Sequence, residues 1–153
     1  MKKIAVGFCF VVFSLLAHAQ FAVNYYYDGH TIGLSTNPEK GHWFEFRVNT
    51  VSYIFSDWQH SDRGITQAYY CFRLVSEQKA ALYGGFGVGA PLLSNEIGWA
   101  SINVPVGLQI NPFNQLPRLY LTAEYNPMLA VTHDFEVINT LSVGFRYILN
   151  KRK

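Results

Sequence analysis

Alternation between apolar and polar residues is the feature of this sequence that most limits the folds open to it. In residues 139–149, Leu141, Val143 and Phe145 fall on one face of an extended chain and Arg146 falls on the other. A period of two is typical of β-strands, because successive side chains of a strand point to opposite faces. Beyond the amino-terminal segment, no window shows a sustained helical repeat or an apolar run long enough to span a membrane as a helix. The sequence therefore predicts an all-β protein.

Seven further segments show the same alternation and are separated by Gly, Pro, Asn, Asp and Ser, the residues that commonly end strands. The predicted strands are residues 22–36, 42–49, 51–58, 65–74, 80–89, 100–110, 119–126 and 139–149. Segment 22–36 changes phase near Asp28-Gly29, which we interpret as a β-bulge within one strand. We therefore expect eight strands.

The polar faces of these segments decide between two kinds of barrel. A soluble antiparallel sheet buries its apolar face, whereas a membrane barrel directs apolar side chains to lipid and polar ones to its interior. The polar faces here are rich in Gly, Ser, Thr, Asn, Gln and Tyr, and only 14% of all residues are charged, against about 25% in an average soluble domain. The prediction is an antiparallel up-and-down transmembrane β-barrel, whose closure removes unpaired strand edges.

The amino-terminal residues have the three parts of an export signal. Two lysines precede an apolar run at residues 4–17, and a small-x-small cleavage site follows at Ala17-His18-Ala19. The apolar run is shorter than the roughly 18 to 20 residues that a membrane-spanning helix needs. We expect a signal peptide at residues 1–19, cleaved after Ala19, and a barrel domain at residues 20–153.

Charge and cysteine content exclude nucleic-acid binding, a disulfide and a cysteine-rich zinc site for the exported chain. Removal of Lys2 and Lys3 reduces the twelve Lys and Arg residues to ten, which equals the ten Asp and Glu residues. A formal charge of zero supplies no attraction for nucleic acid. Cys9 lies in the predicted signal, so Cys71 is the only cysteine left, and neither an internal disulfide nor a cysteine-rich zinc site can form. We expect Cys71 to be an interior packing residue.

Connection lengths predict the orientation of the barrel. Outer-membrane barrels have short periplasmic turns, longer external loops and, with an even strand number, both termini in the periplasm. The predicted periplasmic turns are residues 49–50, 76–79 and 112–117, and the predicted external loops are residues 37–41, 59–64, 91–98 and 132–138.

Three segments together with the export signal carry a resemblance to a known class. These are residues 104–108 (VPVGL), 121–125 (LTAEY) and 141–147 (LSVGFRY). With them the chain resembles a small eight-stranded outer-membrane β-barrel protein of Gram-negative bacteria. The resemblance implies an outer-membrane location, contact with outer-membrane lipid and recognition by the barrel assembly machinery. Members of this class usually end on an aromatic residue, whereas this chain continues past Tyr147 to Lys153.

Five charged residues fall on the predicted interior faces and are the first candidate site. Charges there are costly to bury unless they are paired, so we expect a salt-bridge network that fills the lumen. With the last hairpin centred near Asp134, Glu124 and Arg146 fall almost directly opposite each other. An ion or proton path is the alternative, which an eight-stranded lumen is too narrow to favour. The candidate interior residues are Glu45, Arg47, Arg73, Glu124 and Arg146.

The three tryptophans are the second candidate site. Trp43, Trp58 and Trp99 lie at strand ends that the predicted orientation places at the external rim, and strand parity points them inward. One interpretation is an aromatic mouth that binds an external ligand such as a sugar. The other is that they join the lipid-facing aromatic belt, to which we also assign Tyr25, Tyr26 and Tyr27.

Three other residue groups have the composition of a functional site but not its spacing or context. His60-Ser61-Asp62 has the residue types of a catalytic relay, but sequence neighbours are poorly placed to form one. His42, His60 and His133 are predicted on the external side without the spacing of a metal site. The glycines of residues 84–89 lack the helix that a phosphate cradle needs, so we expect inward glycines that make room for bulky neighbours.

The sequence thus predicts no catalytic site, metal or cofactor. We expect a non-catalytic outer-membrane protein with a structural, adhesion or surface-binding role. The alternatives are a lipid-modifying outer-membrane enzyme, of the lipid A deacylase or acyltransferase type, and a secreted soluble barrel that holds a small ligand.

Overall fold

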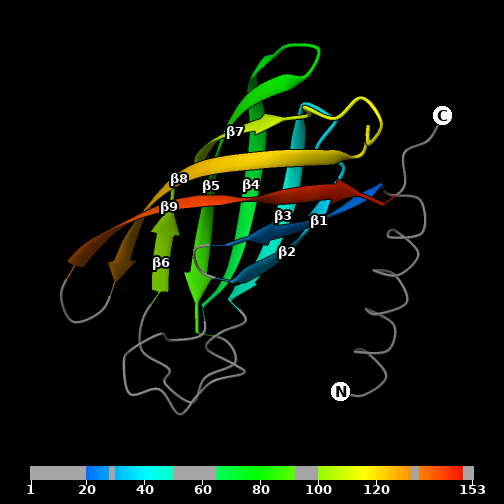
Figure 1. The fold of residues 1–153 in the computed structure, drawn as a ribbon. Coiled ribbons are helices and arrows are strands. Elements are labelled where there is room, and N and C mark those ends of the chain that lie inside the picture. Colours follow the sequence, from blue (N-terminus) through cyan, green and yellow to red (C-terminus); the bar gives the residue numbers. More distant parts are fainter. Residues whose placement is uncertain (1–19, 28–29, 50–64, 92–99, 132–134, 150–153) are drawn as a thin grey trace, which may run out of the picture.

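The computed structural model describes residues 20–27, 30–49, 65–91, 100–131 and 135–149, and its regular elements are strands (Figure 1). Among these residues there is no helix of the length and apolar character needed to cross a membrane. The strands are β1 (Phe21–Tyr26), β2 (Thr31–Thr36), β3 (His42–Asn49), β4 (Thr66–Ser76), β5 (Ala80–Ala90), β6 (Ala100–Asn103), β7 (Val106–Ile110), β8 (Leu119–Val131) and β9 (Phe135–Ile148).

These nine elements form eight barrel strands, because β6 and β7 are two pieces of one strand. Both pieces pair with β5 on one side and with β8 on the other. The break falls at Val104 and Pro105, and proline lacks the N–H that a ladder requires. The Pro105 carbonyl still accepts a hydrogen bond from Gly85 N at 2.9 Å, and Val104 N donates to the Pro127 carbonyl at 3.1 Å.

The sheet closes on itself. β1 pairs with β2 and with β9, β4 pairs with both β3 and β5, and all pairings are antiparallel. The predicted all-β fold, a closed antiparallel up-and-down barrel of eight strands, is confirmed.

The prediction of one bulged strand over residues 22–36 is wrong. This segment forms two strands, β1 and β2, which pair from Phe21↔Thr36 to Tyr26↔Thr31. The phase change therefore marks a hairpin turn, next to which His30 has a positive φ of 43°. The predicted strand 51–58 lies outside the described residues. The expected number of strands is still found, because the hairpin supplies the additional one.

The extra strand reverses the direction of residues 42–49 and the end at which segment 37–41 lies, whereas the segments from residue 65 onward run as predicted. In an up-and-down barrel each strand crosses the wall, so successive connections alternate between the two ends. The end that carries residues 20 and 149 is here called the terminal end. It also carries the connections 37–41, 77–79 and 111–118. The opposite end is called the distal end. The prediction of an external loop at 37–41 is thus wrong, because this segment lies at the end that carries residues 20 and 149: Tyr120 OH donates to Glu39 Oε1 at 3.2 Å, and Asn37 forms a hydrogen bond with Gln20.

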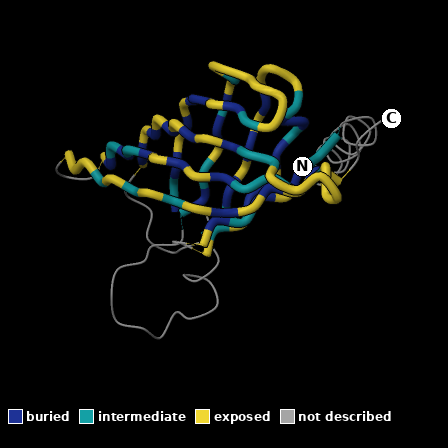
Figure 2. The backbone as a smooth tube through the Cα atoms, turned by 45° about the horizontal axis from the view of Figure 1, so that its top comes forward, coloured by how far each residue is buried: buried dark blue, intermediate teal, exposed yellow. Residues whose placement is uncertain are grey.

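Buried and exposed residues alternate along the strands (Figure 2). The buried positions are largely polar and the exposed ones largely apolar. Phe44 is 63% exposed and Val88 61%, whereas Glu45 is 2% and Arg146 0% exposed. The interior contains a cluster of buried apolar side chains, formed by Trp43, Tyr69, Cys71 and Tyr83.

Inward glycines make room for bulky side chains, as predicted. A Cβ on Gly107 would lie 2.4 Å from the Tyr83 ring, and a Cβ on Gly87 would lie 2.4 Å from the Tyr69 ring. Both distances are far below van der Waals contact, so these two positions need glycine for side chains to cross the lumen.

Candidate functional site

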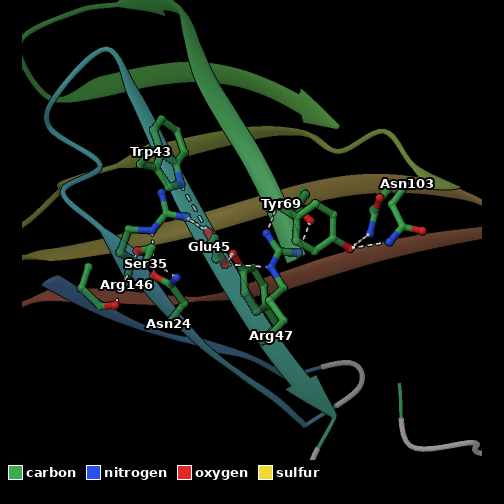
Figure 3. A network of polar contacts seen from close by, with 12 residues as sticks. Asn24, Ser35, Trp43, Glu45, Arg47, Tyr69, Asn103 and Arg146 are labelled. Carbon is green, nitrogen blue, oxygen red and sulfur yellow. Dashed lines mark hydrogen bonds and ion pairs between the residues drawn. The ribbon is translucent and has the colours of Figure 1, made fainter. Parts of the chain in front are cut away.

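Four charged side chains form a chain of ion pairs inside the barrel (Figure 3). Each occupies an inward position that the period of two of its strand dictates. Glu45 and Arg47 come from β3, Glu124 from β8 and Arg146 from β9. The order of contacts is Arg146, Glu45, Arg47, Glu124, so that opposite charges alternate and the four charges sum to zero.

Arg47 is the centre of this network. Its Nη1 and Nη2 donate to the two carboxylate oxygens of Glu124 at 2.6 and 2.8 Å, and its Nε donates to Glu45 Oε1 at 2.7 Å. β3 and β8 lie on opposite sides of the barrel, with β2, β1 and β9 between them on one side and β4, β5 and β6/β7 on the other. The bidentate pair of Arg47 and Glu124 therefore spans the full width of the lumen.

Arg146 uses its three nitrogens on three acceptors. Its Nη2 donates to Glu45 Oε2 at 2.8 Å, its Nε to Asn24 Oδ1 at 2.7 Å and its Nη1 to Gln109 Oε1 at 2.7 Å. Asn24 in turn donates to Ser35 Oγ at 3.2 Å. This second guanidinium thus joins β9 to β1, β3 and β7.

Aromatic side chains complete the shell of both arginines. The Arg47 guanidinium lies 4.3 Å from the ring centroid of Tyr26 and 4.3 Å from that of Tyr69. The Tyr26 hydroxyl donates to Glu45 Oε1 at 2.8 Å, and the Tyr83 hydroxyl donates to Glu124 Oε2 at 2.8 Å. Both carboxylates are therefore held by arginine and tyrosine together, as buried charges require.

A neutral polar layer lies on the distal side of the ion pairs. The Tyr69 hydroxyl accepts hydrogen bonds from Asn126 Nδ2 at 2.8 Å and from Asn103 Nδ2 at 3.3 Å, which links β4, β6 and β8 (Figure 3). All three side chains are at most 5% exposed. This layer continues the buried polar contacts of the ion pairs toward the distal end.

The segment 37–41 adds a further layer at the terminal end. Pro38 is fully buried, and its carbonyl accepts a hydrogen bond from Arg73 Nη2 at 2.7 Å. Arg73 also donates to Ser76 Oγ at 3.4 Å, and it is not part of the ion-pair network. The predicted interior residue Arg73 thus lies near the terminal opening, where it fastens the turn.

The predicted pairing of Glu124 with Arg146 is wrong. Glu124 lies opposite Ser142 on β9, and Arg146 lies opposite Tyr120 on β8. The partner of Glu124 is Arg47, on the far side of the lumen. The prediction considered neighbouring strands only, whereas long side chains in a narrow barrel also reach across it.

The prediction that Trp43 lies at the end of the barrel away from the termini is wrong. Trp43 is the second residue of β3, at the terminal end; it is 1% exposed and packs edge-on against Tyr83 with ring centroids 5.4 Å apart. The indole lies 5.1 Å from the Arg146 guanidinium and donates to Glu45 Oε2 at 3.4 Å. Trp58 and Trp99 lie outside the described residues.

Some network residues were missed by the sequence reasoning. Asn24 and Tyr26 were missed because the hairpin was drawn as one strand, and Tyr26, expected at an interface, is 2% exposed in the lumen. Gln109 and Tyr83 had inward parity in the predicted strands, so the pattern could have identified them. Polar, hydrogen-bonding side chains at inward positions were the available signal.

The other sequence candidates do not combine into a reactive site in the described part of the chain. His42 lies at the terminal end, whereas His60, Ser61, Asp62 and His133 lie outside the described residues. No group of three or more His, Cys, Asp and Glu residues that could hold a metal ion is found among the residues described. Chemically, the arrangement neutralises charge and fills space, because each buried carboxylate is already engaged by an arginine.

Comparisons of the chain with protein-family models, with curated proteins and with solved structures found no match.

Proposed function

We propose that this protein is an integral outer-membrane β-barrel of a Gram-negative bacterium, non-catalytic, with a structural, adhesion or surface-binding role. The observation that carries the proposal is the inverted distribution of side chains on the barrel wall. Apolar residues on the outer face are largely exposed, including Phe46 at 48%, Ile102 at 53% and Phe145 at 50%. They come from β3, β6 and β9; β8 separates β6 from β9, and two strands separate β3 from each of them.

Such a surface is unfavourable in water. Soluble monomers rarely expose contiguous apolar patches larger than a few hundred Å², whereas lipid chains solvate an apolar wall and tolerate no open backbone. The wall also carries an apolar hollow of about 400 Å³ on β7, β8 and β9. Its outward side chains include Leu108, Leu121, Ala123 and Phe145.

The interior argues against a soluble carrier. A soluble barrel that holds a small ligand would bury apolar residues, whereas this lumen buries two arginines and two glutamates in mutual contact. The bridge between Arg47 and Glu124 blocks the described lumen, which favours a binding or structural role over transport. In this proposal the terminal end faces the periplasm and the distal end faces outward, and the barrel assembly machinery inserts the chain.

Fractionation of cells that express the full chain tests the membrane location. We expect the protein in the outer-membrane fraction, extracted by detergent only, with a folded form that migrates differently from the boiled form on a gel. Recovery of folded protein from the soluble periplasm without detergent would refute the proposal. A periplasmic soluble protein from the same cells is the control for lysis.

Brominated lipids test the wall directly. Phe145→Trp on β9 and Leu108→Trp on β7 each place an indole on the proposed lipid-facing surface, on strands that β8 separates. Both new indoles should be quenched by bromine on the lipid chains and spared by iodide in the buffer. Quenching by iodide alone would show that the wall faces water.

A further inference from the structure

β9 extends well beyond the strand that flanks it on one side. It pairs with β8 along an unbroken register, from Tyr147↔Leu119 to Phe135↔Val131. It pairs with β1 only from Ile148 to Gly144, and the shorter β1–β2 hairpin ends there. Figure 1 shows β8 and β9 running on together past this hairpin. In the described residues, segment 135–141 thus has a partner strand on one side only.

Two backbone hydrogen bonds of β9 show which of its backbone groups face the open side. Val143 accepts from the N–H of Tyr27 at 2.8 Å on the β1 side, whereas Ile148 donates to the Arg118 carbonyl at 3.0 Å on the β8 side. Backbone groups of an antiparallel strand alternate in direction from residue to residue, and no bulge interrupts the register of β9 with β8. The residues whose N–H and C=O groups face the open edge are Phe135, Val137, Asn139 and Leu141.

This edge lacks the features that protect edge strands. Native proteins shield such edges with proline, lysine, bulges or short length. Residues 135–141 contain no proline and no lysine, and Glu136 is their only charge. Their outward side chains are highly exposed, with Phe135 at 78%, Leu141 at 72% and Val137 at 65%.

We propose that the edge of β9 at residues 135–141 binds an extended segment of another polypeptide, which adds to the barrel sheet as a further strand. Only a second backbone offers alternating donors and acceptors that match this row, so the chemistry selects a polypeptide. Apolar side chains at alternate positions of the segment would pack on Phe135, Val137 and Leu141. A basic side chain on its other face would pair with Glu136. The inference deepens the proposed surface-binding role and rests on it for placing this edge outside the cell.

A second copy of this chain fits the edge less well. Two copies inserted in one membrane share the same polarity, so a two-fold axis along the membrane normal would bring their β9 edges together in parallel. Each backbone N–H would then lie at the height of the same N–H of the other copy, and each carbonyl at the height of the same carbonyl. Donors would face donors, so the two edges would form no hydrogen-bonded ladder.

The probe is a fluorescent nine-residue peptide of alternating valine and lysine, titrated onto the full barrel domain in lipid nanodiscs. The control peptide has the same sequence with N-methyl groups on alternate residues, which removes the donors of one edge. We expect saturable binding of the first peptide and about tenfold weaker binding of the second, because several backbone hydrogen bonds are lost.

Two variants at one position locate the binding edge. Val137→Pro removes one N–H that faces the open side and leaves the ladder with β8 intact. Val137→Thr keeps the N–H and the β-branched shape. We expect about tenfold weaker binding for Val137→Pro and a change below about threefold for Val137→Thr, with both variants folded by gel mobility.

Equal binding of the two variants, or of the two peptides, would overturn the inference. Concentration-dependent dimers of the unliganded barrel that Val137→Pro abolishes would also overturn it, because the edge would then be a self-association surface. Fractionation and lipid quenching test the outer-membrane location without the peptide. Failure of that proposal can therefore be distinguished from failure of the binding inference.

Discussion

Removal of Arg47 tests the lumen network most directly. Its guanidinium donates to Glu45 at 2.7 Å and to both oxygens of Glu124 at 2.6 and 2.8 Å, and both carboxylate side chains are 0% exposed. Arg47→Met keeps much of the side-chain volume but removes both arginine donors of Glu124, which retains the hydrogen bond from the Tyr83 hydroxyl. Because a stranded buried charge costs about 3–5 kcal/mol, we expect the free energy of unfolding to fall by about that amount.

A double-mutant cycle separates the contact from general damage to the lumen. Arg47→Met and Glu124→Leu together remove both charges and leave apolar side chains, while Glu45 keeps its bonds to Arg146 and Tyr26. Replacement of a buried ion pair by apolar groups is often close to neutral. We therefore expect the double variant to lose less stability than the sum of the single variants, by at least about 1 kcal/mol.

The assay is equilibrium unfolding in urea with the barrel in lipid vesicles, followed by the fraction that keeps the gel mobility of the folded form. Arg73→Met is the matched control, because Arg73 is also an inward arginine but donates to the Pro38 carbonyl and to Ser76. Its loss should cost less than about 1.5 kcal/mol. The reasoning is refuted if Arg47→Met costs no more than Arg73→Met, or if the cycle is additive.

Three further predictions address packing and closure. Gly107→Ala should destabilise the barrel by about 1–3 kcal/mol, because the new Cβ would lie 2.4 Å from the Tyr83 ring, whereas Gly41→Ala, with nothing within 4 Å, should unfold at the same urea concentration as the parent. Cys71, which is 0% exposed, should react with a maleimide only after unfolding, and rapid labelling of the folded protein would contradict the packing described. Purified barrel in a planar bilayer should show no stable conductance steps, since Arg47 and Glu124 bridge the lumen; reproducible steps would contradict a closed lumen.

The alternation of side chains was sufficient to predict the architecture. Because the period of two is a property of the strand itself, it shows from the sequence which residues share a face, and the inward positions of Glu45, Arg47, Glu124 and Arg146 agree with the structure. The scarcity of charge on the polar faces predicted a polar interior. The number of strands also agreed, although one of those drawn, 22–36, was in fact a hairpin.

Tertiary structure alone decided which ends and which side chains meet. A β-bulge and a tight turn both shift the alternation of apolar and polar residues by one position, as seen near residues 28–29. Only the pairing of β1 with β2 shows that this segment is a hairpin. That one turn placed Trp43 at the terminal end and segment 37–41 beside the termini. The partner of Glu124 was likewise beyond local inference, because Arg47 lies far from it along the chain and across the lumen. Alternation specifies a face, whereas closure of the sheet determines which faces oppose each other, and closure depends on the register of all strands at once.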